Sequence, residues 1–241
     1  MPLPDITAPT YDLVLPSNNK KIKFRPFIVK EEKILILALE SRDNEQITNA
    51  VKQVISNCIV TKGIDVETLP IFDIEYLFLN IRAKAVGEAI ELIITCGDDG
   101  KTRVPATVYV DEIKVQKPKE HTDKIKIDGG YSIQMRYPSL EQFVNNNFDI
   151  SDKSSETLDR SFKLIADCID IVYNEEDCWA AADCTETELL DFIEKLSPKS
   201  YKKIEQFFKT MPKLSHSLTV VNPETGVENT IVLEGLSDFF A

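Results

Sequence analysis

Hydrophobic and polar residues alternate in two short segments near the start of the chain. Apolar side chains take every second position in 11–15 and again in 21–24, which is typical of strands with one buried face. Asn18-Asn19 lies between the segments, and asparagine tolerates the positive φ of a tight turn. The pattern predicts a β-hairpin, and Pro26 ends it because proline cannot donate a ladder hydrogen bond.

A helical pattern replaces the alternation over residues 30–42. The run 34–39 inside it is apolar on every side, which predicts a helix that is buried on most sides or faces a partner. Leu37→Asp is therefore expected to place an unpaired charge in an apolar site and to cost several kcal/mol. Two more helices are predicted, over 45–58 after a cap at Asp43-Asn44 and from Leu69-Pro70 onward.

The middle of the chain returns to a period of two. The predicted strands cover 87–96, 102–110, 113–115, 125–127 and 131–137. Asp98-Asp99-Gly100 and Asp128-Gly129-Gly130 supply the turn residues between neighbouring strands. These strands predict a small antiparallel sheet.

Helical periodicity resumes after Pro138. Helices are predicted at about 155–173, 185–195 and 198–210. Their starts carry cap signals, which are Ser139 with Gln142, Thr185 with Glu188, and Ser197-Pro198.

Residues 218–241 predict a closing hairpin and an apolar tail. Residues 218–221 and 230–233 alternate around a turn that contains Pro223 and Gly226. In the tail 233–241, Phe239 and Phe240 either close the core or insert into a partner, because an exposed aromatic patch is costly.

The order of elements predicts an α+β fold. It consists of an N-terminal β-hairpin and helices, a small central antiparallel sheet, C-terminal helices and a closing β-hairpin. We divide the chain into an N-terminal hairpin plus helical region (1–86), a central antiparallel β region (87–138), and a helical region with the C-terminal hairpin and apolar tail (139–241).

Composition narrows the classes of partner. A hydrophobic content of 43% is enough to build a core, and a net charge of −12 argues against a nucleic-acid binder and favours a basic partner. The start Met1–Asp5 lacks the features of a signal peptide, and no apolar run approaches the ~18–20 residues that a membrane span needs. We therefore expect the five cysteines to be reduced thiols.

No catalytic, cofactor or metal site is predicted. His121 and His216 lie beside no serine or cysteine nucleophile signature. Cys178 and Cys184 are spaced too loosely for a zinc site, and the loop at Asp98 lacks the distal glutamate of an EF-hand. Glycine-rich phosphate loops are missing too, so no small-molecule substrate is expected.

Charge is distributed unevenly along the sequence. Acidic residues dominate 149–195, which is either a solvated helix face or a docking surface for a basic partner. Basic residues gather near the amino end, at Lys20, Lys21, Lys23, Arg25 and Lys30. These bases can meet acids of the same chain or of a neighbouring protein.

Several segments, taken in order, resemble the baseplate hub subunit family of T4-like tailed bacteriophages, especially its cyanophage-like branch. Among them are Phe24-Arg25-Pro26-Phe27, Phe72-Asp73-Ile74-Glu75-Tyr76 and Met135-Arg136-Tyr137-Pro138-Ser139. Others lie at 30–35, 49–55, 82–88, 96–100, 207–214 and 233–240. The resemblance runs from about residue 20 to the end and is least clear over 149–195.

The resemblance implies a non-enzymatic hub structural or assembly protein that docks other phage baseplate or hub proteins. It implies a place in the host cytoplasm during assembly, or in the tail baseplate of the virion if the protein is retained. Alternatives are a transient chaperone absent from the virion and a hub-associated cell-wall hydrolase, which the missing catalytic signature disfavours. From the residues, candidate partner-binding positions are Lys21, Lys23, Arg25, Phe27, Leu37, Phe239 and Phe240.

Overall fold

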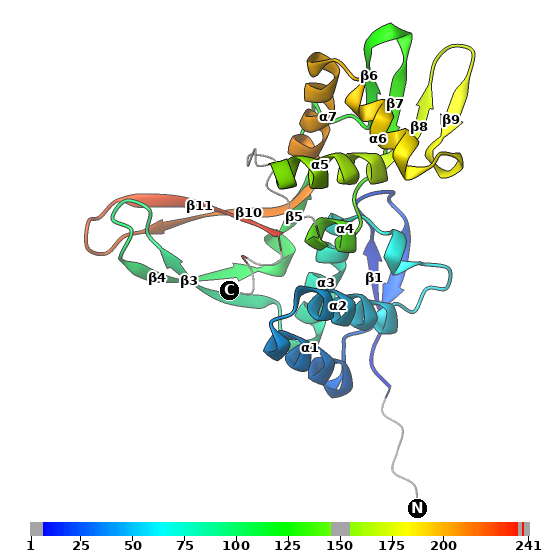
Figure 1. The fold of residues 1–241 in the computed structure, drawn as a ribbon. Helices are drawn as coiled ribbons and strands as arrows, with labels where there is room; N and C mark the ends of the chain where they lie inside the picture. The colour runs from blue at the N-terminus through cyan, green and yellow to red at the C-terminus, as the bar shows by residue number, and fades with distance from the viewer. Residues whose placement is uncertain (1–6, 146–154, 236–237, 239–241) are drawn as a thin grey trace, which may run out of the picture. The chain divides into compact units, whose positions relative to one another are not determined.

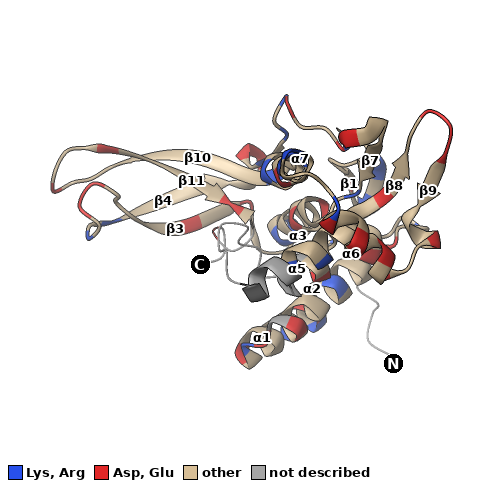
Figure 2. Cartoon of the chain, turned by 45° about the horizontal axis from the view of Figure 1, so that its top comes forward, with Lys and Arg blue, Asp and Glu red and all other residues tan. Residues whose placement is uncertain are grey.

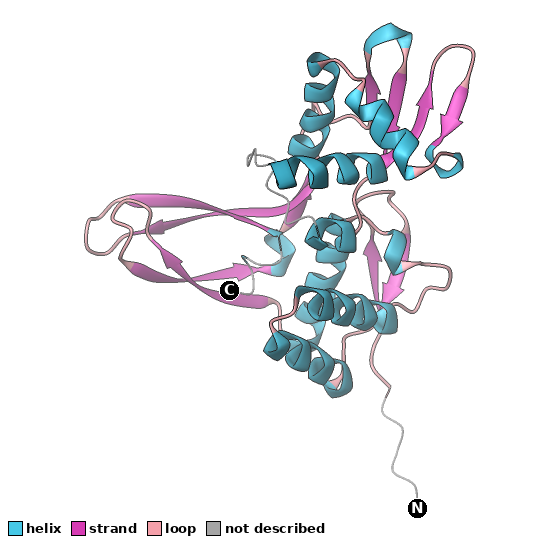
Figure 3. Cartoon of the chain, viewed as in Figure 1, coloured by secondary structure: helices cyan, strands magenta, loops and turns pink. Residues whose placement is uncertain are grey.

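The structure, a computed structural model, describes residues 7–145, 155–235 and 238 (Figure 1). The chain contains both helices and small antiparallel sheets, so the predicted α+β class is confirmed (Figure 3). The chain forms two compact units, unit 1 from Met1–Gln116 with Lys213–Ala241, and unit 2 from Lys117–Pro212. The division into 1–86, 87–138 and 139–241 stays a prediction.

Unit 1 contains three α-helices and seven strands within the described residues. In chain order they are β1 (Tyr11–Val14), β2 (Lys21–Phe24), α1 (Val29–Ser41), α2 (Asn44–Cys58), α3 (Ile71–Val86), β3 (Ala89–Thr95), β4 (Arg103–Tyr109), β5 (Lys114–Gln116), β10 (Lys213–Val221) and β11 (Glu228–Glu234). The predicted N-terminal hairpin, the first three helices and the closing hairpin are all present.

The β1–β2 hairpin forms as the alternation predicts. The strands pair antiparallel with Tyr11 opposite Phe24, and Asn19 in the turn has a φ of 57°. Ile22 and Phe24 are buried, whereas the lysines between them are exposed. One face of the hairpin therefore joins the core and the other faces solvent.

Helices α1 and α2 lie side by side as a helical hairpin (Figure 1). Asp43 begins α2 as predicted, because its side chain accepts hydrogen bonds from the backbone N–H groups of Glu45 and Gln46. Helix α3 follows Pro70 at its N-cap and buries residues on most of its circumference. It packs against α2, β5 and β10, so it is the centre of unit 1.

The strands of unit 1 form three small sheets. These are the pair β1–β2, the pair β3–β4 and the three-stranded sheet β11-β10-β5. Side chains from the inner faces of the last two sheets and from α3 form one core, which comprises Leu79, Ala83, Ile90, Leu92, Ile94, Cys96, Val108, Val110, Ile113, Leu214, Val220 and Leu233. The predicted central strands thus do not share a single sheet.

Asp98 lies in the turn between β3 and β4, and its hydrogen bonds join this turn to the β10–β11 hairpin. Its carboxylate accepts hydrogen bonds from Asn222 Nδ2 at 3.0 and 3.1 Å, from Thr225 Oγ1 at 2.5 Å and from Asn229 Nδ2 at 3.0 Å. Its backbone N–H donates to Asn229 Oδ1 at 3.0 Å. The hydrogen bonds from Asn222 and Thr225 are the main reason why the pKa of Asp98 is lowered. The loop at Asp98 therefore connects the β3–β4 hairpin to the β10–β11 hairpin through hydrogen bonds.

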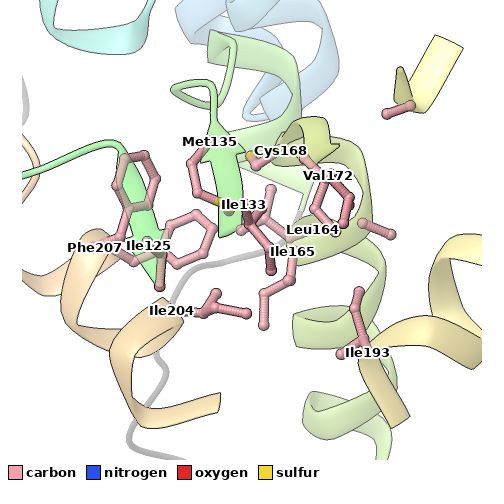
Figure 4. Close-up of a cluster of buried hydrophobic side chains, with 14 of the residues drawn as sticks. Ile125, Ile133, Met135, Leu164, Ile165, Cys168, Val172, Ile193, Ile204 and Phe207 are labelled. Carbon is pink, nitrogen blue, oxygen red and sulfur yellow. The ribbon is translucent and has the colours of Figure 1, made fainter. Parts of the chain in front are cut away.

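Unit 2 is a four-stranded antiparallel sheet with helices. In chain order its elements are β6 (Lys124–Lys126), β7 (Ser132–Met135), α4 (Leu140–Asn145), α5 (Ser155–Cys168), β8 (Ile169–Tyr173), β9 (Cys178–Ala180), α6 (Glu186–Glu194) and α7 (Pro198–Thr210). The strand order is β6-β7-β8-β9. Its core lies between the sheet and α5, α6 and α7, and includes Ile125, Ile133, Leu164, Ile165, Ile193, Ile204 and Phe207 (Figure 4).

Helix caps in unit 2 follow the sequence, but one predicted boundary is wrong. Thr185 and Ser197 cap α6 and α7 as predicted. The predicted helix over 155–173 ends at Cys168, and Ile169–Tyr173 is the strand β8. This segment pairs with β7 on one side and β9 on the other, and such pairing outweighs a helical preference. Among the described residues, no helix combines the length and apolar character that crossing a membrane requires.

Candidate functional site

Helix α1 exposes much of its apolar surface. Its buried positions are Glu31 and Ala38, on one stripe, and α1 packs against α2. Ile36, Leu37 and Leu39 are 50%, 55% and 62% exposed. The run 34–39 is therefore only partly packed inside this chain, and most of the helix circumference is open.

This exposure changes the expectation for Leu37. A side chain that is 55% exposed can turn a carboxylate into water, so Leu37→Asp does not bury an unpaired charge. The expected cost of several kcal/mol is wrong for this chain taken alone. Leu37 stays a candidate partner-binding position.

The inner stripe of α1 is anchored by a charged pair. Glu31 is 3% exposed, and its Oε1 accepts a hydrogen bond from Arg25 Nη2 at 3.0 Å. Its Oε2 accepts from the backbone N–H of Ile28 at 2.9 Å. Burial raises the pKa of Glu31, but the hydrogen bonds from Arg25 and Ile28 outweigh it, so the net pKa is lowered. Glu31 is thus held as a carboxylate at the start of the helix.

Arg25 is occupied within the chain. Besides Glu31, its guanidinium donates to the backbone carbonyl of Pro26 at 2.9 Å and contacts Cys58 Sγ at 3.8 Å. The hydrogen bond to Glu31 is the main cause of its raised pKa. Burial raises the pKa of the Cys58 thiol to about 11, so the sulfur beside Arg25 is uncharged.

The other basic candidates differ in their surroundings. Lys21 is exposed and forms an ion pair with Asp12 at 3.3 Å, and Lys23 is exposed beside it on β2. Phe27 is half-buried in the segment between β2 and α1. The structure thus brings Lys21, Lys23, Arg25 and Phe27 onto one continuous segment that leads into α1. Phe239 and Phe240 lie outside the described residues.

A second group of exposed apolar side chains lies on the outer face of the β3–β4 hairpin. Ile93 is opposite Pro105 and Ala89 is opposite Tyr109, all four are exposed, and the exposed pair Glu91–Thr107 lies between them. Ile93, at 70% exposed, is the most exposed isoleucine among the described residues. The sequence alone did not lead us to predict this surface, which we call the hairpin face. The signal was present in Leu92-Ile93-Ile94, where an apolar residue occupies the position that alternation assigns to solvent.

Asp73 and His121 have structural partners within the chain. Asp73 is fully buried and accepts hydrogen bonds from Ser17 N at 3.0 Å and Ser17 Oγ at 2.5 Å, while burial raises its pKa. His121 Nδ1 is 3.0 Å from Thr210 Oγ1, and His121 Nε2 is 2.9 Å from Tyr137 Oη. Burial lowers the pKa of His121. Within the described ranges, no group of three His, Cys, Asp or Glu side chains is placed to hold a metal ion.

The acidic residues of unit 2 face solvent where the structure describes them. Figure 2 shows them on α6 and on the loop between β8 and β9. The exposed acids include Asp170, Glu175, Glu176, Asp177, Asp183, Glu188 and Asp191. Glu186 is also exposed and pairs with Lys163 at 3.1 Å. This arrangement fits a solvated face and remains compatible with a basic partner.

A sequence profile of the family described as T4 bacteriophage base plate protein matches residues 8–241. The chain belongs to this family. Comparison with curated proteins and with solved structures gave no match. Membership implies a structural role in a phage tail baseplate and contacts with other baseplate proteins.

Proposed function

We propose that this chain is a hub component or hub assembly protein of the baseplate, of the cyanophage-like kind, and that it works by protein–protein docking without catalysis. The observation that carries the proposal is the outer half of α1, where a baseplate family member exposes Ile36, Leu37 and Leu39. A partner that covers these side chains removes apolar area from water, which stabilises the complex by about 25 cal/mol per Å².

The basic segment before α1 adds positive charge to the same unit. Lys21 and Lys23 are exposed on β2, so an incoming acidic partner can meet positive charge there. Charges at the rim of an interface mainly set the association rate and the choice of partner, whereas the buried apolar centre sets the affinity. Phe27, half-buried between them, belongs to the same segment.

The test is affinity purification of the tagged chain from infected cells. We expect baseplate or hub proteins to be recovered with it. Replacing Ile93 and Tyr109 together by serine tests the hairpin face, and replacing Ile36 and Leu39 together tests α1. A paired serine substitution of Thr219 and Thr230, which are exposed and opposite each other on the β10–β11 hairpin, is the matched control. Recovery of no tail or baseplate protein would refute the proposal.

A transient assembly chaperone is the alternative that the same exposed surfaces favour. Such a protein would shield a hub partner in the host cytoplasm and leave before the particle is complete. Quantitative mass spectrometry of purified particles separates the two roles. Stoichiometric presence in the virion supports a hub component, and its loss from finished particles supports the chaperone.

A further inference from the structure

Five exposed residues of α1 form one stripe along the helix. Val29, Lys33, Ile36, Leu37 and Glu40 are all exposed. At about 100° per residue they fall within an arc of about 100°, opposite the buried positions Glu31 and Ala38. We call this set the α1 stripe. Apolar side chains occupy its centre and its amino end, and one basic and one acidic residue flank the centre.

The two charges of the α1 stripe have no ion-pair partner among the residues that the structure describes. Lys33 and Glu40 are seven residues apart, which is about 10 Å along the helix axis and too far for an ion pair. Neither forms an ion pair with any residue that the structure describes. Both are therefore available to a molecule that covers the stripe.

Their positions are symmetric about the apolar centre. Lys33 precedes Ile36 by three residues, and Glu40 follows Leu37 by three residues. A second copy of α1, laid antiparallel so that Ile36 faces Leu37 of the other copy, places each Lys33 opposite a Glu40. One twofold axis then produces two identical ion pairs around an apolar centre, which is the self-complementarity that a symmetric dimer requires. A parallel pair would instead place Lys33 against Lys33.

We propose that the α1 stripe is a self-association surface, and that its occupant is the α1 stripe of a second copy of this chain in antiparallel orientation. The inference concerns the chain itself and does not depend on its position in the hub. A helix of 13 residues is about 20 Å long, so a contact about 10 Å wide covers roughly 200 Å² per copy. That is well below the ~800 Å² per partner of a stable interface. The dimer is therefore weak, with a dissociation constant of roughly 0.1–1 mM.

Weak pairing of this kind acts where copies are held close together. A tether or a shared scaffold gives an effective concentration in the millimolar range, which is enough to close the contact without tight binding in dilute solution. In a baseplate, this behaviour would join neighbouring copies only after each one is bound. This consequence rests on the proposed function, whereas the pairing does not.

The test is sedimentation equilibrium of the purified chain up to about 1 mM, with charge-reversed variants. We expect the average mass of the wild type to rise above the monomer value of 27.3 kDa as concentration increases. Lys33→Glu and Glu40→Lys, tested separately, each create two like-charge pairs per dimer and should weaken association about tenfold or more. Because both side chains are exposed, folding should be unchanged by circular dichroism.

The double variant Lys33→Glu/Glu40→Lys decides the orientation. It exchanges the two charges, so an antiparallel dimer regains both ion pairs and association should return to the wild-type level. Mixing the two single variants should also restore association. Lys101→Glu, at an exposed position in the β3–β4 turn, is the matched control and should behave as the wild type.

Three results would overturn the inference. The wild type could remain monomeric at about 1 mM, or the single variants could associate as well as the wild type. If the double variant stays monomeric while the wild type dimerises, the two charges do not face each other and the orientation is wrong. The hairpin-face arm of the affinity-purification test does not involve α1, so its result is independent of these outcomes.

Discussion

The buried carboxylate of Glu31 supports the sharpest stability prediction. Its oxygens accept hydrogen bonds from Arg25 and from the backbone of Ile28, and together these tie the start of α1 to the end of β2. Glu31→Ala removes both contacts and leaves a largely enclosed guanidinium without its carboxylate. We therefore expect α1 to unfold locally before the rest of unit 1 unfolds.

The magnitude follows from the kind of contact. A hydrogen bond to a charged group contributes about 1.5–3 kcal/mol, and the loss of a helix cap costs about 1 kcal/mol. The Arg25 side chain is 24% exposed, so water replaces part of the lost contact. We therefore expect Glu31→Ala to lower the free energy of unfolding by about 2–4 kcal/mol. Glu31→Gln keeps an acceptor oxygen and should cost about 1–2 kcal/mol.

The assay is urea denaturation followed by circular dichroism, together with hydrogen exchange of the α1 amides. Glu31→Ala, Arg25→Ala and the double variant form a double-mutant cycle, whose coupling should be about 1–3 kcal/mol. Trp179, the single tryptophan, lies in unit 2, so its fluorescence serves as an internal control for the other unit. A coupling below about 0.5 kcal/mol would show that the Arg25–Glu31 contact does not stabilise α1.

Acid provides an independent check on the same pair. The pKa of Glu31 is lower in the folded chain than in the unfolded chain, so its stabilising contribution is complete above the unfolded value. That contribution disappears as the pH falls from about 4.3 through the folded pKa. The difference in unfolding free energy between wild type and Glu31→Gln should therefore shrink below about pH 4. A constant difference across this range would contradict the assignment.

Three shorter predictions concern exposure and packing. Leu37→Asp should change the free energy of unfolding by less than about 1 kcal/mol in thermal or urea unfolding, and a larger loss would mean that Leu37 is covered within the chain. Phe207→Ala removes a buried ring from the core of unit 2 and should cost about 3–5 kcal/mol, seen as a lower midpoint in Trp179 fluorescence; an unchanged midpoint would contradict the packing. A maleimide should modify exposed Cys178 in the native chain and reach buried Cys168 only after unfolding, and equal rates for the two would refute this burial pattern.

Local signals predicted most helices because each signal and its effect lie within one turn. The caps at Asp43, Thr185 and Ser197 each satisfy backbone N–H groups a few residues away, so the sequence marks these starts directly. The hairpin turn at Asn19 is predicted for the same reason, because its positive φ is a property of one residue.

Strand assignments failed where tertiary contacts decide the structure. The segment 164–173 is rich in apolar residues, and such a run suits a buried helix or a buried strand equally well. Its change from α5 to β8 depends on pairing with β7 and β9, and β9 itself is too short to produce a pattern. The pairing of β5 with β10 joins residues about a hundred positions apart, which periodicity does not reveal.

The exposed apolar surface of α1 was predicted only in part. An all-apolar helix indicates that its surface must be covered, but the sequence does not say which side this chain covers. That information depends on where α2 packs, and it separates inward Ala38 from outward Leu37. Arg25 illustrates the reverse case, since a basic residue expected at a partner surface lies against Glu31 in the same chain.

The pairing of β5 with β10 also determines when unit 1 can be completed during synthesis. Gln116, the last residue before unit 2, pairs directly with Lys213, the first residue after it. A ribosome that adds about 5–20 residues per second needs roughly 5–20 s to make the intervening segment 117–212. During this interval β5 has no partner strand, and the inner face of β3–β4 lacks the side chains that β10 and β11 contribute to the shared core. Unit 2 can therefore fold first, while the unit that surrounds it in sequence is still incomplete.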